Sequence, residues 1–155
     1  MVAMQGHEHD TDVAPAPPRR GRRVLVLANE AAPSERLVAS IRGHLSERAG
    51  ARVLVVAPAP NGRLRHRRPD TDAARTAAVR RLQACIEALA AAGVEAEGMI
   101  GDADPLQAVE DAVRIFPADL VIVASLGDER SNRRARTVVD RATRKFSLPT
   151  THLAA

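Results

Sequence analysis

Five short apolar segments, separated by longer amphipathic stretches, give the chain its hydrophobic pattern. In chain order they are "RVLVLAN" (23–29), "ARVLVVAP" (51–58), "VEAEGMI" (94–100), "ADLVIVAS" (118–125) and "PTTHLAA" (149–155). Short continuous apolar runs are typical of strands that are covered on both faces of a sheet. The third segment alternates apolar and polar residues, which indicates a strand nearer the sheet edge. The fourth is the most apolar and is predicted to be central.

The amphipathic stretches carry helix start signals. Ser34, Thr71 and Asp104 are candidate N-caps, and Pro105 follows Asp104 at the first helical position, which favours a helix start. We predict a fourth helix over residues 134–146. Apolar residues at helical spacing define the buried faces of the first three helices: Leu37, Ile41 and Leu45; Val79, Leu82, Ile86 and Leu89; and Leu106, Val109, Val113 and Phe116.

Five strands that alternate with four helices predict an α/β fold. Right-handed crossovers place helices on both faces of a single doubly wound, open parallel sheet. In such sheets ligands bind outside the carboxyl ends of the strands. The loops that follow the first four strands should therefore meet at one edge of the molecule, and we expect any binding site there.

The fold is predicted to occupy residues 22–155. Residues 1–21, "MVAMQGHEHDTDVAPAPPRRG", are polar and proline-rich without hydrophobic periodicity, so we predict a disordered N-terminal tail. The remaining length suits one domain. Cys85 is the only cysteine, which excludes an intrachain disulfide and a cysteine-based metal cluster. It lies beside a predicted buried helix face, where we expect a small buried hydrophobic residue.

Hydrophobicity, charge and aromatic content limit the classes of partner that the protein can bind. No apolar run approaches the roughly 18 residues that span a membrane, and the N-terminus lacks the charged-then-apolar order of a signal peptide. We therefore expect a cytoplasmic protein that does not enter a membrane. The net charge of +4 permits anionic partners without selecting one. Phe116 and Phe146 are the only aromatic residues. Since single strands usually stack their bases on aromatic rings, we do not expect a nucleic-acid partner.

Two loops at the expected binding edge are rich in arginine. They are either solvated charge runs or an anion clamp, because guanidinium groups match phosphate oxygens bidentately. Asp70, Asp128 and Glu129 stand close by and can neutralise part of the charge. The arginines of the candidate clamp are Arg63, Arg65, Arg67 and Arg68 in the first loop, and Arg130, Arg133 and Arg134 in the second.

The sequence contains no catalytic constellation. Ser125 lacks a GxSxG elbow, and there is no GxxxxGK[ST] phosphate loop. The five histidines lack the spacing of metal ligands, and capping explains Asp102 and Asp104 at a helix start. We therefore predict no enzymatic activity and no metal requirement.

Three stretches of the chain resemble a universal stress protein domain, and more narrowly the actinobacterial branch of small stress-protein-like domains. The resemblance covers residues 22–155 and rests on "VLVLANEAAPSERL", "GDADPLQAVEDAVRIFPADLVIVASLG" and "RTVVDRATRKFSLPTTHLAA". It implies the strand order 3-2-1-4-5, no catalysis, and dimerisation through the last strand. Because a short edge strand without charged residues invites another strand, we expect a homodimer through it.

ATP-binding members of that family carry the motif G-2x-G-9x-G-[S/T] after the fourth strand. In this chain Ala124 stands at the first glycine and Gly127 at the second. Arg136 stands at the third, after eight residues instead of nine, and Thr137 keeps the hydroxyl. Asn29 replaces an aspartate that contacts the nucleoside. Because glycine lets backbone N–H groups approach phosphate, Arg136 alters this cradle and offers a cation in return.

The resemblance therefore implies a stress-response module with a degenerate site for ATP or AMP. The alternative is a dimerisation or protein-interaction domain that binds no nucleotide. The residues expected to contact the nucleotide are Asn29, Ala57, Ala124, Gly127, Arg136 and Thr137.

Overall fold

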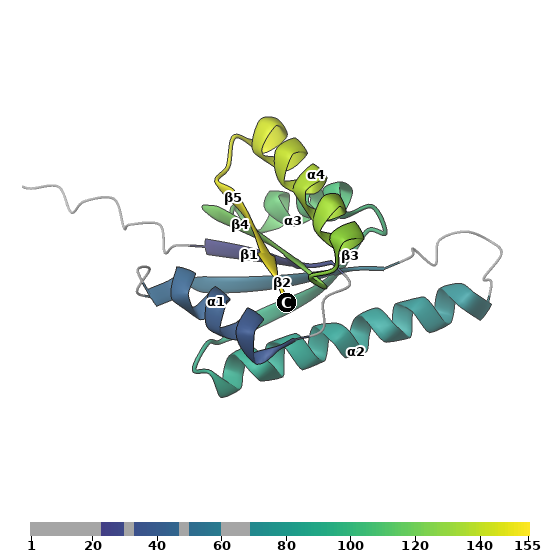
Figure 1. Ribbon diagram of the computed structural model, residues 1–155, viewed down its shortest axis with the longest axis horizontal. Helices are drawn as coiled ribbons and strands as arrows, with labels where there is room; N and C mark the ends of the chain where they lie inside the picture. Colours follow the sequence, from purple (N-terminus) through teal and green to yellow (C-terminus); the bar gives the residue numbers. More distant parts are fainter. Residues whose placement is uncertain (1–22, 30–32, 47–49, 60–68) are drawn as a thin grey trace, which may run out of the picture.

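A computed structural model describes residues 23–29, 33–46, 50–59 and 69–155 of the chain. Within these residues five strands alternate with four helices, arranged as Figure 1 shows. The strands are β1 (Arg23–Ala28), β2 (Arg52–Pro58), β3 (Ala96–Gly101), β4 (Leu120–Ser125) and β5 (Thr150–Ala154). The helices are α1 (Glu35–Ser46), α2 (Pro69–Ala91), α3 (Pro105–Ile115) and α4 (Glu129–Phe146). The predicted tail lies outside the described residues.

The strands form one parallel sheet in the order β3-β2-β1-β4-β5, which confirms the predicted fold class and strand order. The middle strand is β1, whose Leu25 lies level with Leu54 of β2 and Val121 of β4. The prediction that "ADLVIVAS" is central was wrong in detail. It forms β4, an interior strand between β1 and β5, and its hydrophobicity reflects burial on both faces, which β1 shares.

Helices cover both faces of the sheet in two layers (Figure 1). Side chains of β1 alternate between the layers: Val24 and Val26 pack with α1 and α2, while Leu25 and Leu27 pack with α3 and α4. Each of these four side chains is at most 3% exposed. Full burial of a Val or Leu side chain is worth about 1.5–3 kcal/mol, so these two layers stabilise the sheet that carries the site.

Two of the predicted helix starts are confirmed by their hydrogen bonds. The Ser34 hydroxyl accepts a bond of 3.0 Å from the backbone N–H of Leu37 at the start of α1. The Asp104 carboxylate accepts one of 2.9 Å from the N–H of Leu106 at the start of α3, directly after Pro105. Each cap satisfies a backbone donor that would otherwise lack a partner in the first helical turn.

The start and the buried face of α2 differ from the prediction. The helix begins at Pro69, so Thr71 lies inside its first turn rather than before it; proline suits the first position because its missing N–H is not needed there. Val79 is 36% exposed, and the buried face is instead made by Ala78, Leu82, Cys85 and Leu89. Cys85 is buried as predicted, and burial raises the pKa of its thiol.

The face of α3 that packs on the sheet consists mainly of small residues. Ala108, Val109 and Ala112 are buried, whereas Leu106 and Val113 of the predicted face are only half-buried. Gly101, at the end of β3, permits this close approach: a Cβ there would come within 2.8 Å of the Ala108 Cβ. The start of α3 is thereby held against the carboxyl edge of the sheet.

Candidate functional site

The carboxyl ends of the parallel strands meet at one edge, as the alternation of elements predicted. Asn29 directly follows β1, and its backbone N–H donates a 3.1 Å hydrogen bond to the carbonyl of Ala124 in β4. The end of β2 is tied to the end of β3 by a 3.1 Å bond from the Ala59 N–H to the Gly101 carbonyl. The candidate nucleotide-binding residues that follow β1 and β4 therefore belong to one edge of the molecule.

The segment after β4, predicted as a loop up to residue 133, is helical from Glu129 onward. The prediction was wrong because Asp128 caps the helix: its carboxylate accepts hydrogen bonds from the Ser131 N–H (2.8 Å) and the Ser131 hydroxyl (2.7 Å). These bonds hold the pKa of Asp128 below its ordinary value. Ser131, Ala135, Val138 and Ala142 form the buried face of α4, at spacings of four, three and four.

This cap bears directly on the phosphate cradle. The N-terminus of a helix attracts anions through its free N–H groups and its dipole. Here the carboxylate of Asp128 already occupies that position. The fold requires glycine at position 127 independently of any phosphate, because its φ is +89° and a Cβ would lie 2.9 Å from the carbonyl oxygen of Ala155. The glycine therefore shapes the turn from β4 into α4 and makes room for the last residue.

Arg136 and Thr137 lie well inside α4 rather than in the first turn of the predicted helix. The Thr137 hydroxyl donates a 3.2 Å hydrogen bond to the carbonyl of Arg133, one turn earlier. Arg136 is exposed and stands near His152 of β5; burial of the ring, and next the charge of Arg136, lower the pKa of His152. The two residues therefore face different neighbours, because successive helical residues are about 100° apart.

A polar network around the buried Ser125 joins β4, α4 and β5. The Ser125 hydroxyl, in a residue that is 0% exposed, lies 2.8 Å from Asn132 Oδ1 and 2.7 Å from His152 Nε2. Asn132 Nδ2 donates to the Gly127 carbonyl at 3.2 Å, which fixes the orientation of the amide. Asn132 Oδ1 can then only accept, so Ser125 donates to it and His152 Nε2–H donates to Ser125.

The direction of these bonds distinguishes the network from a catalytic pair. A nucleophilic serine donates its proton to the histidine that acts as base, and it must be reachable by a substrate. Here the serine proton points to the amide of Asn132, and Ser125 is fully buried. The arrangement is that of a structural tie between elements.

An open cleft of about 370 Å³ lies between the end of β1, the start of α3 and one side of α4. Its polar lining comes from all three elements: Asn29, Asp104, Arg134, Thr137 and Arg141. Guanidinium groups bind phosphate oxygens, and an amide, a hydroxyl and a carboxylate can hydrogen-bond a sugar or a base. The cleft therefore combines the groups that a small phosphorylated ligand needs.

The structure gathers only some of the predicted site residues in this cleft. Asn29 and Thr137 line it, and Arg134 of the candidate clamp joins them. Ala57 and Ala124 are buried in the core at 0% and 1% exposure. The first arginine loop, with Arg63, Arg65, Arg67 and Arg68, lies outside the described residues. The remaining clamp residues, Arg130 and Arg133, are exposed on α4.

Sequence reasoning missed Arg141, Asn132 and His152. Arg134, Thr137 and Arg141 are spaced by three and four residues, which places them on one side of a helix. That signal becomes visible once Arg134 is assigned to the helix rather than to a loop boundary. The partners of Ser125 lie seven and 27 positions along the chain, and only the packing of α4 and β5 against β4 brings them together.

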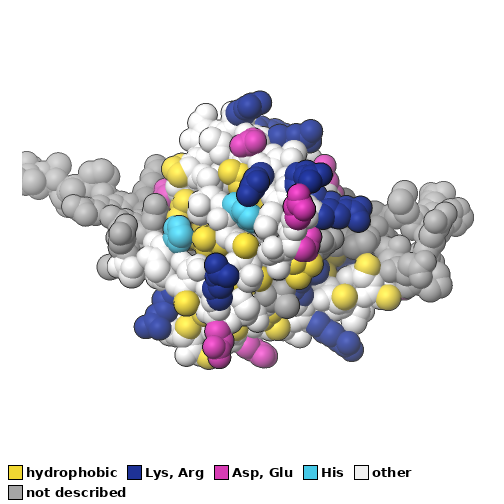
Figure 2. Space-filling model, in the orientation of Figure 1, with side chains coloured by type: hydrophobic (Ala, Val, Ile, Leu, Met, Phe, Trp, Pro, Cys, Tyr) yellow, Lys and Arg dark blue, Asp and Glu magenta, His cyan; other side chains and the backbone are white. Residues whose placement is uncertain are grey.

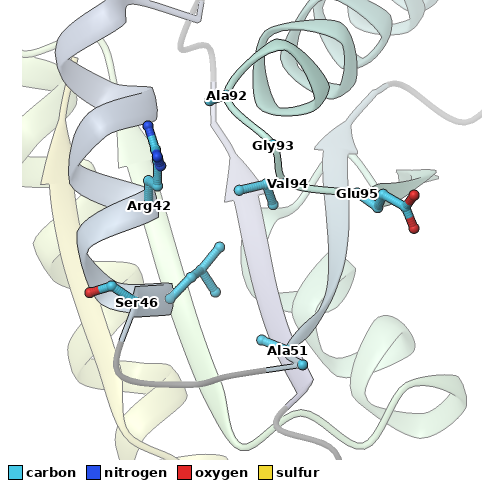
Figure 3. Close-up of a pocket in the computed structure, with 9 residues that line it drawn as sticks. Arg42, Ser46, Ala51, Ala92, Gly93, Val94 and Glu95 are labelled. Atoms are coloured by element: carbon cyan, nitrogen blue, oxygen red, sulfur yellow. The ribbon is translucent and has the colours of Figure 1, made fainter.

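A wider cavity, of about 660 Å³, lies at the opposite edge of the sheet, between the last turn of α1, the end of α2 and the start of β2. Figure 3 shows that its two charged side chains, Arg42 and Glu95, point away from one another. Backbone and small apolar side chains make up most of the remaining wall. Without converging polar groups, this cavity offers a ligand little to recognise.

Metal and membrane features are absent from the part of the chain that the structure describes. No group of three or more histidine, cysteine, aspartate or glutamate residues there is arranged to hold a metal ion. Nor does any helix among these residues combine the length and hydrophobicity needed to cross a membrane.

Solved structures identify the fold. A universal stress protein from Archaeoglobus fulgidus is similar with a TM-score of 0.60 and 18% identity, covering 84% of this chain and 92% of that chain. The universal stress protein from the same organism in complex with dAMP is similar with a TM-score of 0.58 and 16% identity, covering 84% of this chain and 96% of that chain. A universal stress protein family protein from Arabidopsis thaliana with AMP bound is similar with a TM-score of 0.56 and 14% identity, covering 84% of this chain and 91% of that chain.

No protein-family model and no curated protein matches the sequence. The likeness therefore lies in the three-dimensional arrangement of the elements. The chain has the fold of the universal stress proteins, as the resemblance of its sequence segments predicted.

Proposed function

We propose that the protein is a non-enzymatic module that binds an adenine nucleotide, ATP or AMP, in the cleft between β1, α3 and α4. The observation that carries the proposal is the convergence of Asn29, Thr137 and Arg141 on one open cleft at the carboxyl edge. Two structures of the same fold, one in complex with dAMP and one with AMP bound, support this class of ligand.

The degenerate character of the site follows from the start of α4. Because Asp128 caps the helix, the phosphate is held by side chains and not by a backbone cradle. Arg141 supplies a charged donor to the phosphate. The Thr137 hydroxyl, whose proton goes to the Arg133 carbonyl, accepts a hydrogen bond from the nucleoside. Asp104 repels phosphate at the start of α3, so the phosphate lies on the α4 side, and Asp104 accepts a hydrogen bond from a ribose hydroxyl instead. Asn29 offers the nucleoside both a donor and an acceptor.

Calorimetric titration with AMP and with ATP tests this proposal. Arg141→Ala removes one of the two cations that line the cleft and should weaken binding by about 1.5–3 kcal/mol, the usual worth of a hydrogen bond to a charged group. Arg133→Ala is the matched control: Arg133 lies on the same helix, pairs with Glu129 at 3.4 Å and does not line the cleft. Failure of the parent protein to bind either nucleotide at millimolar concentration, or equal affinities of both variants, overturns the proposal.

A second candidate function is homodimerisation, and the position of β5 favours it. The strand is the edge of the sheet beside β4 and contains no charged residue other than the titratable His152. Its five residues are all partly exposed. An edge strand of this kind offers unpaired backbone groups to a second copy of the chain. Dimerisation is compatible with the nucleotide site, because β5 contributes no residue to the cleft.

A further inference from the structure

Helix α4 concentrates the positive charge of the protein. It carries six arginines and one lysine against two acids, Glu129 and Asp140. The full chain has 23 basic and 19 acidic residues, so the other 137 residues hold 16 basic and 17 acidic residues. Outside α4 the chain is therefore close to neutral. Arginine runs also occur at 19–23 and 63–68, but acids elsewhere in the chain balance their charge.

Most of this charge lies on one face. At about 100° per residue, six cations fall within a sector of about 120° that also contains Thr137 and no acid. We call this sector the basic face of α4; it consists of Arg130, Arg133, Arg134, Arg141, Arg144 and Lys145. All six side chains are exposed, and Figure 2 shows the dark blue side chains gathered over α4. From Arg130 to Arg144 the face runs for about 21 Å along the helix.

Arg133 and Lys145 form ion pairs with acidic neighbours, and the Arg133 pair is open to solvent. Arg133 lies 3.4 Å from Glu129, with side chains that are 78% and 91% exposed. Lys145 lies 2.5 Å from Glu110 of α3, with side chains that are 48% and 19% exposed. Exposed ion pairs are worth little, so an incoming anion with several charges can replace Glu129 as the partner of Arg133.

The composition of the basic face selects the kind of anion. Among the described residues, the exposed large hydrophobic side chains are Val79, Ile115 and Leu126, and none of them is in α4. The face therefore lacks the apolar residues with which an amphipathic helix enters a membrane surface. It also lacks an aromatic platform for stacked bases, because Phe146 lies on the inner side of the helix against the core.

We propose that the basic face of α4 binds the phosphate backbone of duplex nucleic acid without regard to base sequence. A duplex is a straight rod with closely and regularly spaced phosphates. A straight helix with arginines at intervals over about 21 Å can contact several of them at once. Arginine suits this task because its guanidinium group binds phosphate oxygens bidentately. The sequence argued against single strands through its missing aromatic residues, and that argument does not apply to contacts with a duplex backbone.

Fluorescence anisotropy with a labelled 25-base-pair DNA duplex, over a range of salt concentrations, tests the proposal. Each phosphate contact contributes about −0.9 to the slope of log K against log salt. The Arg130→Gln/Arg144→Gln double variant removes two contacts and should weaken binding about tenfold or more and flatten the slope by about two units. Arg75→Gln/Arg80→Gln makes the same charge change on exposed positions of α2 and should leave binding within about twofold. Circular dichroism verifies that both variants fold.

Three results would overturn the proposal. The parent protein would fail to bind the duplex at low salt, or the two double variants would weaken binding equally, which would make net charge and not the basic face responsible. Tighter binding to vesicles containing phosphatidylserine than to the duplex would identify a lipid surface as the partner of α4. Tight, salt-dependent binding that is lost only in the α4 variant supports the duplex.

Discussion

Replacement of Ser125 by alanine tests the polar network that joins β4, α4 and β5. The substitution removes one hydroxyl from a residue that is 0% exposed, and with it the hydrogen bonds to Asn132 Oδ1 and His152 Nε2. No backbone change accompanies the loss, because alanine fits a strand position that serine already occupies. The effect should therefore report on the hydroxyl alone.

The magnitude follows from the burial of the two partners. An intramolecular hydrogen bond is worth about 0.5–1.5 kcal/mol, and a buried group left without a partner costs about 1–3 kcal/mol. Asn132 and His152 are only half-buried, so water can partly replace the hydroxyl as the hydrogen-bond partner of Asn132 Oδ1 and His152 Nε2. We expect Ser125→Ala to lower the free energy of unfolding by about 1–2 kcal/mol, which corresponds to a fall in Tm of about 2–8 °C for a domain of this size.

Urea denaturation measures this change, and Ser46→Ala provides the control. The Ser46 hydroxyl also donates one hydrogen bond, in its case to the backbone carbonyl of Gly43 at 2.8 Å, but in an exposed position. Its loss should change the unfolding free energy by less than about 0.5 kcal/mol. If the two serine variants are equally stable, the network does not hold these elements together and the reasoning is refuted.

Three further predictions concern His152, the dimer and the tail. Burial and the charge of Arg136 lower the pKa of His152 below 6.5, so on acidification the unfolded chain binds a proton before the folded chain does. The free energy of unfolding should therefore fall as the pH drops below about 6.5. His152→Gln, which keeps an N–H donor, should remove this pH dependence in denaturation curves recorded between about pH 5 and 8. Leu153→Glu should shift a β5-paired dimer to monomer in light scattering, and a parent protein that is monomeric at tens of micromolar removes the basis for that prediction. Deletion of residues 1–21 should leave Tm within about two degrees, and a fall of many degrees would show that the tail packs on the domain.

The sequence predicted the sheet well because its strands are defined by burial on two faces. The apolar runs that became β1, β2 and β4 need no tertiary information to be recognised, and the right-handed connection between parallel strands leaves few arrangements. The caps at Ser34 and Asp104 were predictable for the same reason, since each depends on residues within a few positions.

The start of α4 could not be predicted from hydrophobic periodicity. The first turns of that helix are buried through Ser131 and Ala135, and these small residues carry no hydrophobic signal among the surrounding arginines. The segment therefore resembled a charged loop. The local clue was Asp128, an N-cap residue that stands directly after Gly127. The predicted helix started five residues too late, which moved the expected helix N-terminus away from its actual position. Arg136 was therefore expected in the first turn, where it would stand beside a bound phosphate.

The candidate site was predictable in its location and only partly in its residues. Asn29 could be placed at the carboxyl edge because it directly follows a strand. The role of Arg141 depends on which side of α4 faces the start of α3, and this is decided by packing against the sheet. The tie from His152 to Ser125 depends on the register of β5 against β4.

The position of the bound nucleotide is the most direct test of this account. Addition of AMP to ¹⁵N-labelled protein, followed by amide chemical shifts, should perturb Asn29, Leu106, Thr137 and Arg141, which surround the cleft. The amides from Gly127 to Ser131 should change little, because Asp128 already occupies the N-terminus of α4. Perturbations that are largest at Gly127–Ser131 would place the phosphate in a backbone cradle and contradict the account, and so would a spectrum that AMP leaves unchanged at millimolar concentration.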